Sequence, residues 1–156
     1  MTLNELNILS TEDAGAALLS CCGSHKWANS VARRRPFHSV IELEETSSAI
    51  FAFMDEEDWL EAFSAHPQIG DMNSLSGEQA GMTNAPEGTR RELAEANRAY
   101  LAKFGYIFII CATGKLADDM LKDLKARLGN SPANELAVAA EEQKKITALR
   151  LRRMLG

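Results

Sequence analysis

Apolar residues recur along most of the chain at the three- and four-residue spacing of amphipathic α-helices. The clearest pattern runs through residues 87–104. Similar patterns predict helices through Trp59, Leu60 and Phe63, through residues 116–128, and from Pro132 to about Leu155. The chain therefore reads as one helix after another.

Residues that favour the start or the end of a helix lie between the predicted helices. Polar side chains suited to N-caps precede several of the predicted helices, at Thr2, Ser10, Ser39, Asp55 and Ser131. Gly23 and Ser24 separate a helix that runs towards Cys22 from a short one over residues 25–34. Pro36 ends the short helix, because proline disfavours helical backbone at the residue before it.

Two segments depart from the helical pattern. Residues 70–88 are rich in Gly, Ser, Asn and Pro, and we expect a loop there with a short turn at Glu78 and Gln79. Residues 106–111 form a continuous apolar run with no partner strand, which indicates extended or irregular core. We predict an all-α fold, a single compact domain over residues 1–156. It would have about seven to nine helices and a long loop after His66-Pro67.

Composition and charge narrow the function classes. The chain has 156 residues and a formal net charge of −5, which argues against a nucleic-acid-binding domain. No apolar run approaches the roughly 18 residues of a membrane span, so we expect no membrane partner. Cys21, Cys22 and Cys111 have no metal or redox spacing, and their odd number argues against a disulfide framework. We expect a cytoplasmic protein.

His66 is the first candidate for catalysis. Pro67 favours extended backbone at residue 66, which exposes the imidazole ring at the end of a helix. A histidine with an ordinary pKa of about 6.5 suits proton transfer at neutral pH. The same position also suits a histidine that only caps the helix, and the local sequence leaves both interpretations open.

Three further polar residues could share a site with His66. A carboxylate at Glu78 could orient the imidazole, and Gln79 offers both donors and acceptors to an amide-rich substrate, although the pair also suits an exposed turn. Arg150 shares a helical face with apolar residues, where it could bind a carboxylate or only cover apolar surface with its stem. The chain lacks phosphate-loop, metal-binding and nucleophile-elbow motifs, so we expect neither a metal nor a cofactor.

The order of several short motifs resembles the family of 2-oxo-4-hydroxy-4-carboxy-5-ureidoimidazoline (OHCU) decarboxylases. The strongest are Ala-His-Pro-Gln-Ile-Gly-Asp at 65–71 and Gly-Glu-Gln-Ala-Gly at 77–81. The likeness continues at residues 18–22, 27, 97–100, 104–108, 127–130, 135–136 and 145–151. It therefore covers nearly the whole chain in order.

The resemblance implies a cofactor-free, all-helical enzyme of urate degradation that converts OHCU to (S)-allantoin and CO2. It implies that His66 is the catalytic proton donor, Glu78 its catalytic partner, and Arg150 a contact to the substrate's polar groups. Further substrate-binding positions would be Pro67, Leu75, Ser76, Gln79, Ile109, Ile110 and Cys111. The resemblance also points to a homodimer.

One departure and two alternatives accompany the resemblance. Many relatives carry serine three residues before the glutamate, where this chain has Leu75, so Ser76 or a backbone group would take its place. A helical protein-interaction module would explain the chain without any catalytic role for His66. A decarboxylase of the carboxymuconolactone type is disfavoured, because its Cys-x-x-Cys motif is missing.

Overall fold

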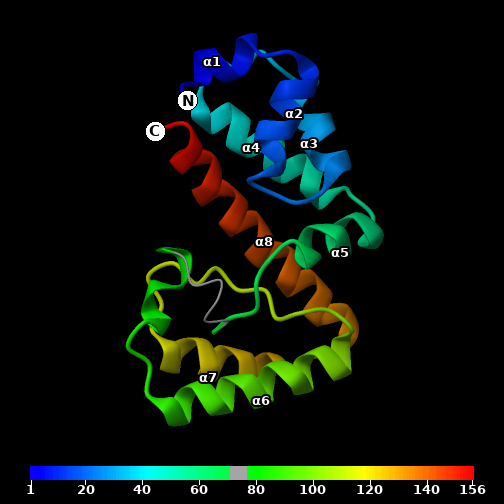
Figure 1. Ribbon diagram of the computed structural model, residues 1–156. Coiled ribbons are helices and arrows are strands. Elements are labelled where there is room, and N and C mark those ends of the chain that lie inside the picture. The colour runs from blue at the N-terminus through cyan, green and yellow to red at the C-terminus, as the bar shows by residue number, and fades with distance from the viewer. Residues whose placement is uncertain (71–76) are drawn as a thin grey trace. The chain divides into compact units, whose positions relative to one another are not determined.

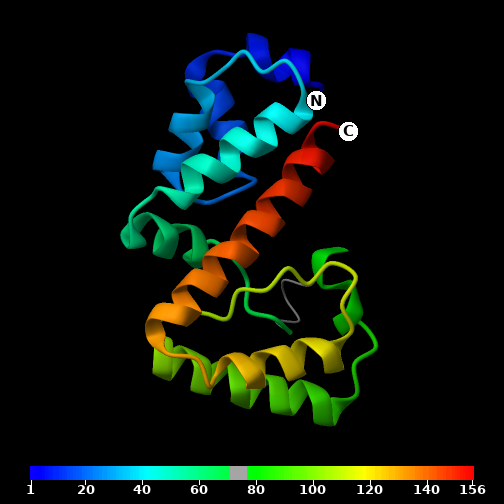
Figure 2. The same cartoon turned by 180° about the vertical axis from the view of Figure 1, so that it is seen from behind.

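A computed structural model describes residues 1–70 and 77–156 of the chain. These residues form eight α-helices and one 3-10 helix, with no β-strand among them (Figures 1 and 2). The predicted all-α class is confirmed. Within the same residues, no helix is both long and apolar enough to cross a bilayer.

The contacts between residues divide the chain into two compact units. The first comprises Met1–Ala65 and Gln143–Gly156, and the second comprises His66–Glu142. Helix α8, Pro132–Met154, contributes its first half to the second unit and its remainder to the first. The assignment of residues 1–156 to one domain stays a prediction.

The first unit is built from short helices with polar N-caps. Its helices are α1 (Leu3–Ile8), α2 (Thr11–Leu19), α3 (His25–Ala32), α4 (Val40–Ala52), α5 (Glu56–Ser64) and the end of α8. Thr2 and Glu5 form the predicted capping box on α1, and the Ser10 side chain caps α2. Helix α2 ends at Leu19, before the predicted end near Cys22.

The buried core of the first unit includes Trp27 on α3. Its indole is fully buried, and Nε1 donates a hydrogen bond to the carbonyl of Ser47 on α4 over 3.1 Å. Leu18, Leu43 and Phe63 are fully buried as well, one from each of α2, α4 and α5. Each of these short helices thus buries at least one large apolar side chain.

The second unit has two long helices with irregular segments packed on them. Helices α6 (Glu87–Phe104) and α7 (Ala117–Arg127) lie side by side, and a 3-10 helix η1 (Gly77–Met82) precedes them (Figures 1 and 2). Helix α6 has the bounds that its sequence pattern predicts. The core of the unit contains Ile69, Met82, Leu93, Ala96, Tyr100, Phe108, Ile110, Ala112, Ala117, Met120, Leu121 and Leu124.

The apolar run between α6 and α7 is irregular, as predicted. Residues 107–112 have no regular secondary structure, although Phe108, Ile109 and Ile110 are buried. The Phe108 ring packs edge-on against Tyr100 of α6, with 5.4 Å between the ring centroids. Side-chain packing therefore holds this segment in the core, and its backbone groups find partners other than a sheet.

Candidate active site

The His66 segment follows directly on the end of α5. The helix ends at Ser64, and Ala65 still has helical backbone, so His66 and Pro67 begin the second unit. Both side chains are half-buried, whereas Ile69 is buried in the core. Gly70 has φ of +88°, a left-handed conformation that favours glycine. This turn explains why a glycine follows the buried isoleucine.

Glu78 and Gln79 lie on η1, where the sequence predicts a short turn. Glu78 is half-buried, and Gln79 is 4% exposed. The Gln79 Oε1 atom accepts a hydrogen bond from the Gly70 amide over 3.0 Å, and its Nε2 donates to the Gln68 carbonyl over 3.4 Å. The Gln79 side chain thus fastens the segment that carries Glu78 to the segment that follows His66.

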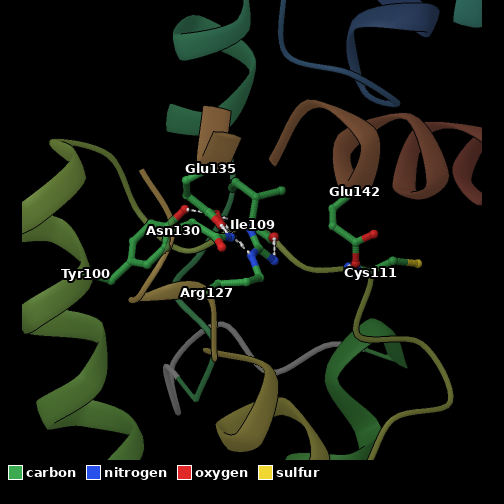
Figure 3. A network of polar contacts seen from close by, with 7 residues as sticks. All are labelled: Tyr100, Ile109, Cys111, Arg127, Asn130, Glu135 and Glu142. Carbon is green, nitrogen blue, oxygen red and sulfur yellow. Dashed lines mark hydrogen bonds and ion pairs between the residues drawn. The ribbon is translucent and has the colours of Figure 1, made fainter. Parts of the chain in front are cut away.

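The predicted pocket-lining residues 109–111 are held by charged side chains from two helices (Figure 3). Arg127 Nη1, at the end of α7, donates to the Ile109 carbonyl over 2.7 Å. The Cys111 amide donates to Oε1 of Glu142 on α8 over 3.2 Å. The first bond satisfies the carbonyl of the buried Ile109, which would be expensive to leave unpaired, and the second holds the half-buried Cys111.

Arg127 itself belongs to a buried polar cluster. Its Nη2 lies 2.9 Å from Glu135 Oε2, and its Nε donates to the same carboxylate. The Tyr100 hydroxyl and the Asn130 amide also donate to Glu135, over 2.8 and 3.2 Å (Figure 3). Burial, together with the nearby Glu135 carboxylate, raises the pKa of Tyr100 far above its ordinary value. The phenol therefore stays protonated and keeps its hydrogen bond.

Arg150 lies on α8 in the first unit and is half-buried. Its positive charge acts on the thiols of Cys21 and Cys22 and favours their ionised forms. Burial outweighs this effect and raises the pKa of Cys22 to about 11. The predicted contact of Arg150 with substrate stays a prediction.

Leu75 and Ser76 lie outside the described residues, so their predicted substrate contacts also stay predictions. Within residues 1–70 and 77–156, no group of three or more His, Cys, Asp or Glu side chains could hold a metal ion. The buried residues Asn97, Arg127 and Glu135 were not among the site residues predicted from the sequence. Their only signal was their place within the motifs at 97–100, 127–130 and 135–136.

A family model described as OHCU decarboxylase matches residues 7–152. The chain belongs to the OHCU decarboxylase family. The resemblance drawn from the short motifs is confirmed, since the match spans nearly all of the sequence in which they occur.

Named relatives agree with this assignment. The chain is 39% identical to the uric acid degradation bifunctional protein TTL of Arabidopsis thaliana, over 87% of this chain and 45% of that protein. It is 30% identical to the OHCU decarboxylase of Mus musculus, over 83% and 78% of the two chains. The chain spans less than half the length of the bifunctional relatives that it matches.

Solved structures share the fold. A crystal structure of OHCU decarboxylase in the presence of (S)-allantoin superposes with a TM-score of 0.83 at 40% identity, covering 94% of this chain and 99% of that one. A crystal structure of (S)-allantoin synthase, at 19% identity, gives a TM-score of 0.81 over 99% of this chain and 54% of that one. The second likeness concerns the fold alone.

Proposed function

We propose that the protein decarboxylates OHCU to (S)-allantoin and CO2 in urate degradation, without a metal or organic cofactor. The proposal rests on membership of the OHCU decarboxylase family. The observation that carries it is the Gln79 bridge, which fastens the segment of Glu78 to the segment that follows His66. Residues 109–111 of the same unit are held in place by Arg127 and Glu142.

The substrate supplies its own electron sink for this reaction. The carboxylate of OHCU is attached to a ring carbon that also carries a hydroxyl and neighbours a C=N bond. When the carbon–carboxylate bond breaks, its electron pair forms a C=C bond within the ring, and the C=N pair moves to nitrogen, which takes a proton. The hydroxyl then loses its proton to become the carbonyl of allantoin, and the neighbouring carbon is protonated. The protein needs only to orient the substrate and deliver a proton to one face.

We propose the residue roles that the family resemblance implies, which suit this chemistry. His66 donates the proton to the ring carbon, and Glu78 orients the imidazole and contacts the ring. Arg150 binds polar groups of the substrate, because a guanidinium presents several donors in a planar fork. Pro67, Gln79 and the backbone of residues 109–111 complete the contacts, with Leu75 or Ser76 in the place of the family serine.

A coupled assay tests the proposal. Purified protein is added to urate, urate oxidase and hydroxyisourate hydrolase, and circular dichroism follows the appearance of allantoin. We expect rapid formation of the S enantiomer, and a loss of about 100-fold or more in rate for His66→Ala and for Glu78→Gln. His25→Ala is the matched control, since His25 is exposed at the start of α3. Slow and racemic product with the unaltered protein would refute the proposed function.

The assembly and location are separate proposals. We infer a homodimer in the cytoplasm, which the family resemblance and the cysteine content support. Light scattering coupled to size-exclusion chromatography measures the mass of the assembly. A mass equal to that of one chain would refute the dimer and leave the proposed activity untouched.

A further inference from the structure

Helix α6 presents two polar side chains to the segments that carry the candidate catalytic residues. Arg90 and Asn97 are seven residues apart, which places them on one face of the helix about 10 Å apart along its axis. Leu93 lies between them on this face and is buried in the core. Packing of Leu93 in the core therefore holds the face of α6 that carries Arg90 and Asn97 against the rest of the unit.

Arg90 binds the chain that leaves η1. Its Nη2 donates to the Met82 carbonyl over 2.6 Å and to the Thr83 carbonyl over 3.2 Å, and its Nε donates to the Ala85 carbonyl over 3.1 Å. One guanidinium thus ties three carbonyls within residues 82–85 to α6. The Met82 carbonyl ends η1, the helix that carries Glu78 and Gln79, and the other two carbonyls lie just after it.

Asn97 binds the chain that follows His66. Its Nδ2 donates to the Ile69 carbonyl over 3.0 Å, and the Asn97 side chain is 4% exposed. A buried carbonyl that lost this donor would have no access to water, so the bond constrains the segment strongly. Its partner lies three residues beyond His66.

Gln79 links the segment bound by Arg90 to the segment bound by Asn97. It lies on η1, and its side-chain amide forms hydrogen bonds with the backbone of Gln68 and Gly70. We propose that Arg90 and Asn97 are positioning residues, which hold the segments of Glu78 and His66 in register on α6. This inference rests on the proposed function, because it gives both residues a task in that reaction. The hydrophobic effect is non-directional, whereas a hydrogen bond constrains both the distance and the direction between the groups that it joins.

Arg90→Ala against Arg91→Ala is the sharpest test. The two arginines are neighbours on α6, and both substitutions remove the same charge and length, but Arg91 is exposed and pairs with Glu87 one turn away. The variants are assayed in the full chain, well below their melting temperatures. The concentration of each variant is then raised until the total rate of allantoin formation equals that with the unaltered protein. The enantiomeric excess of allantoin is measured at this concentration. At equal total rates, spontaneous racemic decay contributes the same share of the product in every sample, so a difference in enantiomeric excess comes from the enzyme.

We expect kcat/KM to fall about 10- to 100-fold for Arg90→Ala, with most of the loss in kcat and a reduced enantiomeric excess. Arg91→Ala should stay within about twofold. Added guanidinium ion should restore part of the activity and the excess of the S enantiomer in Arg90→Ala alone. Asn97→Leu, which keeps the volume and removes the donor, should also lower the enantiomeric excess.

A merely structural role predicts a different result. A destabilised enzyme contains fewer active molecules, but each of them makes the same enantiomer. An unchanged enantiomeric excess in Arg90→Ala at matched rate would therefore overturn the inference, even if the apparent kcat falls.

Hydrogen exchange separates this inference from the proposed function. We expect the peptide covering residues 66–70 to exchange faster in Arg90→Ala than in Arg91→Ala. If the unaltered protein makes no (S)-allantoin, the proposed function fails, and faster exchange still supports the positioning by Arg90. Equal exchange in the two variants overturns the positioning, whatever the activity.

Discussion

Arg127 and Glu135 form a buried ion pair, and the same guanidinium binds the carbonyl of Ile109. Arg127 also lies over the Phe108 ring, 4.3 Å from its centroid. The pair connects the end of α7, the start of α8 and the irregular segment between α6 and α7. The stability of the second unit and the position of the predicted pocket-lining residues 109–111 therefore depend on the same two side chains.

We expect Glu135→Gln to lower the free energy of unfolding by about 3 kcal/mol. The substitution leaves the Arg127 charge buried without its carboxylate, and breaking a buried pair in this way is strongly destabilising. Urea unfolding followed by circular dichroism measures the loss. Activity should fall too, because the Ile109 carbonyl loses a fixed partner.

Glu92→Gln is the matched control for that prediction. Glu92 pairs with Lys125 in the same unit over 3.3 Å, but both side chains are more than half exposed. Exposed pairs contribute about 1 kcal/mol or less. An equal loss of stability in Glu92→Gln and Glu135→Gln would contradict the importance of burial.

We expect Gly81→Ala to displace η1 and to reduce activity. A Cβ atom at Gly81 would lie 1.9 Å from the carbonyl oxygen of Lys115, and backbone cannot move aside as a flexible side chain can. Gly88→Ala is the control, because that site in α6 is open and alanine is favoured there by about 1 kcal/mol. Thermal unfolding should show a loss of stability in Gly81→Ala and a gain in Gly88→Ala. The coupled assay should show reduced activity in Gly81→Ala alone.

The three cysteines should react at very different rates with iodoacetamide at pH 8. Cys111 is half-buried, whereas Cys21 and Cys22 are buried, and burial raises the pKa of both of these thiols. At a pKa of about 11, roughly one Cys22 in a thousand is a thiolate at pH 8. Mass spectrometry should find Cys111 labelled first and Cys22 labelled only after unfolding. Early labelling of Cys22 would show that the first unit opens readily.

Stability should decline at alkaline pH through Tyr100. Its pKa is raised in the folded protein, so an unfolded chain releases this proton at lower pH, near 10. The contribution of the tyrosine is complete below about pH 10 and is lost as the pH rises further. The difference in unfolding free energy between the unaltered protein and Tyr100→Phe should therefore narrow as the pH rises above about 10. A constant difference would contradict a buried, protonated phenol.

The helices were predictable because the information that makes them is local. The capping box at Thr2 and Glu5 uses atoms three residues apart, and the apolar face of residues 87–104 repeats within each turn. The irregular segment at 106–111 was predicted for a similar reason, since an apolar run without a partner strand must find its hydrogen bonds elsewhere. Its partners, Arg127 and Glu142, could not be chosen from the sequence.

For the candidate site too, the sequence predicts the local features and the tertiary structure decides the long-range contacts. The sequence by itself determined the helical class, the turn at Glu78 and the family motifs around His66, because short-range spacing and chemistry carry them. Only the tertiary structure decided that Gln79 and Asn97 fix the backbone around Ile69 and that Arg127 meets Glu135 beside Ile109. These contacts join residues 8 to 28 positions apart, and the packing of the core selects them among many polar side chains of similar type.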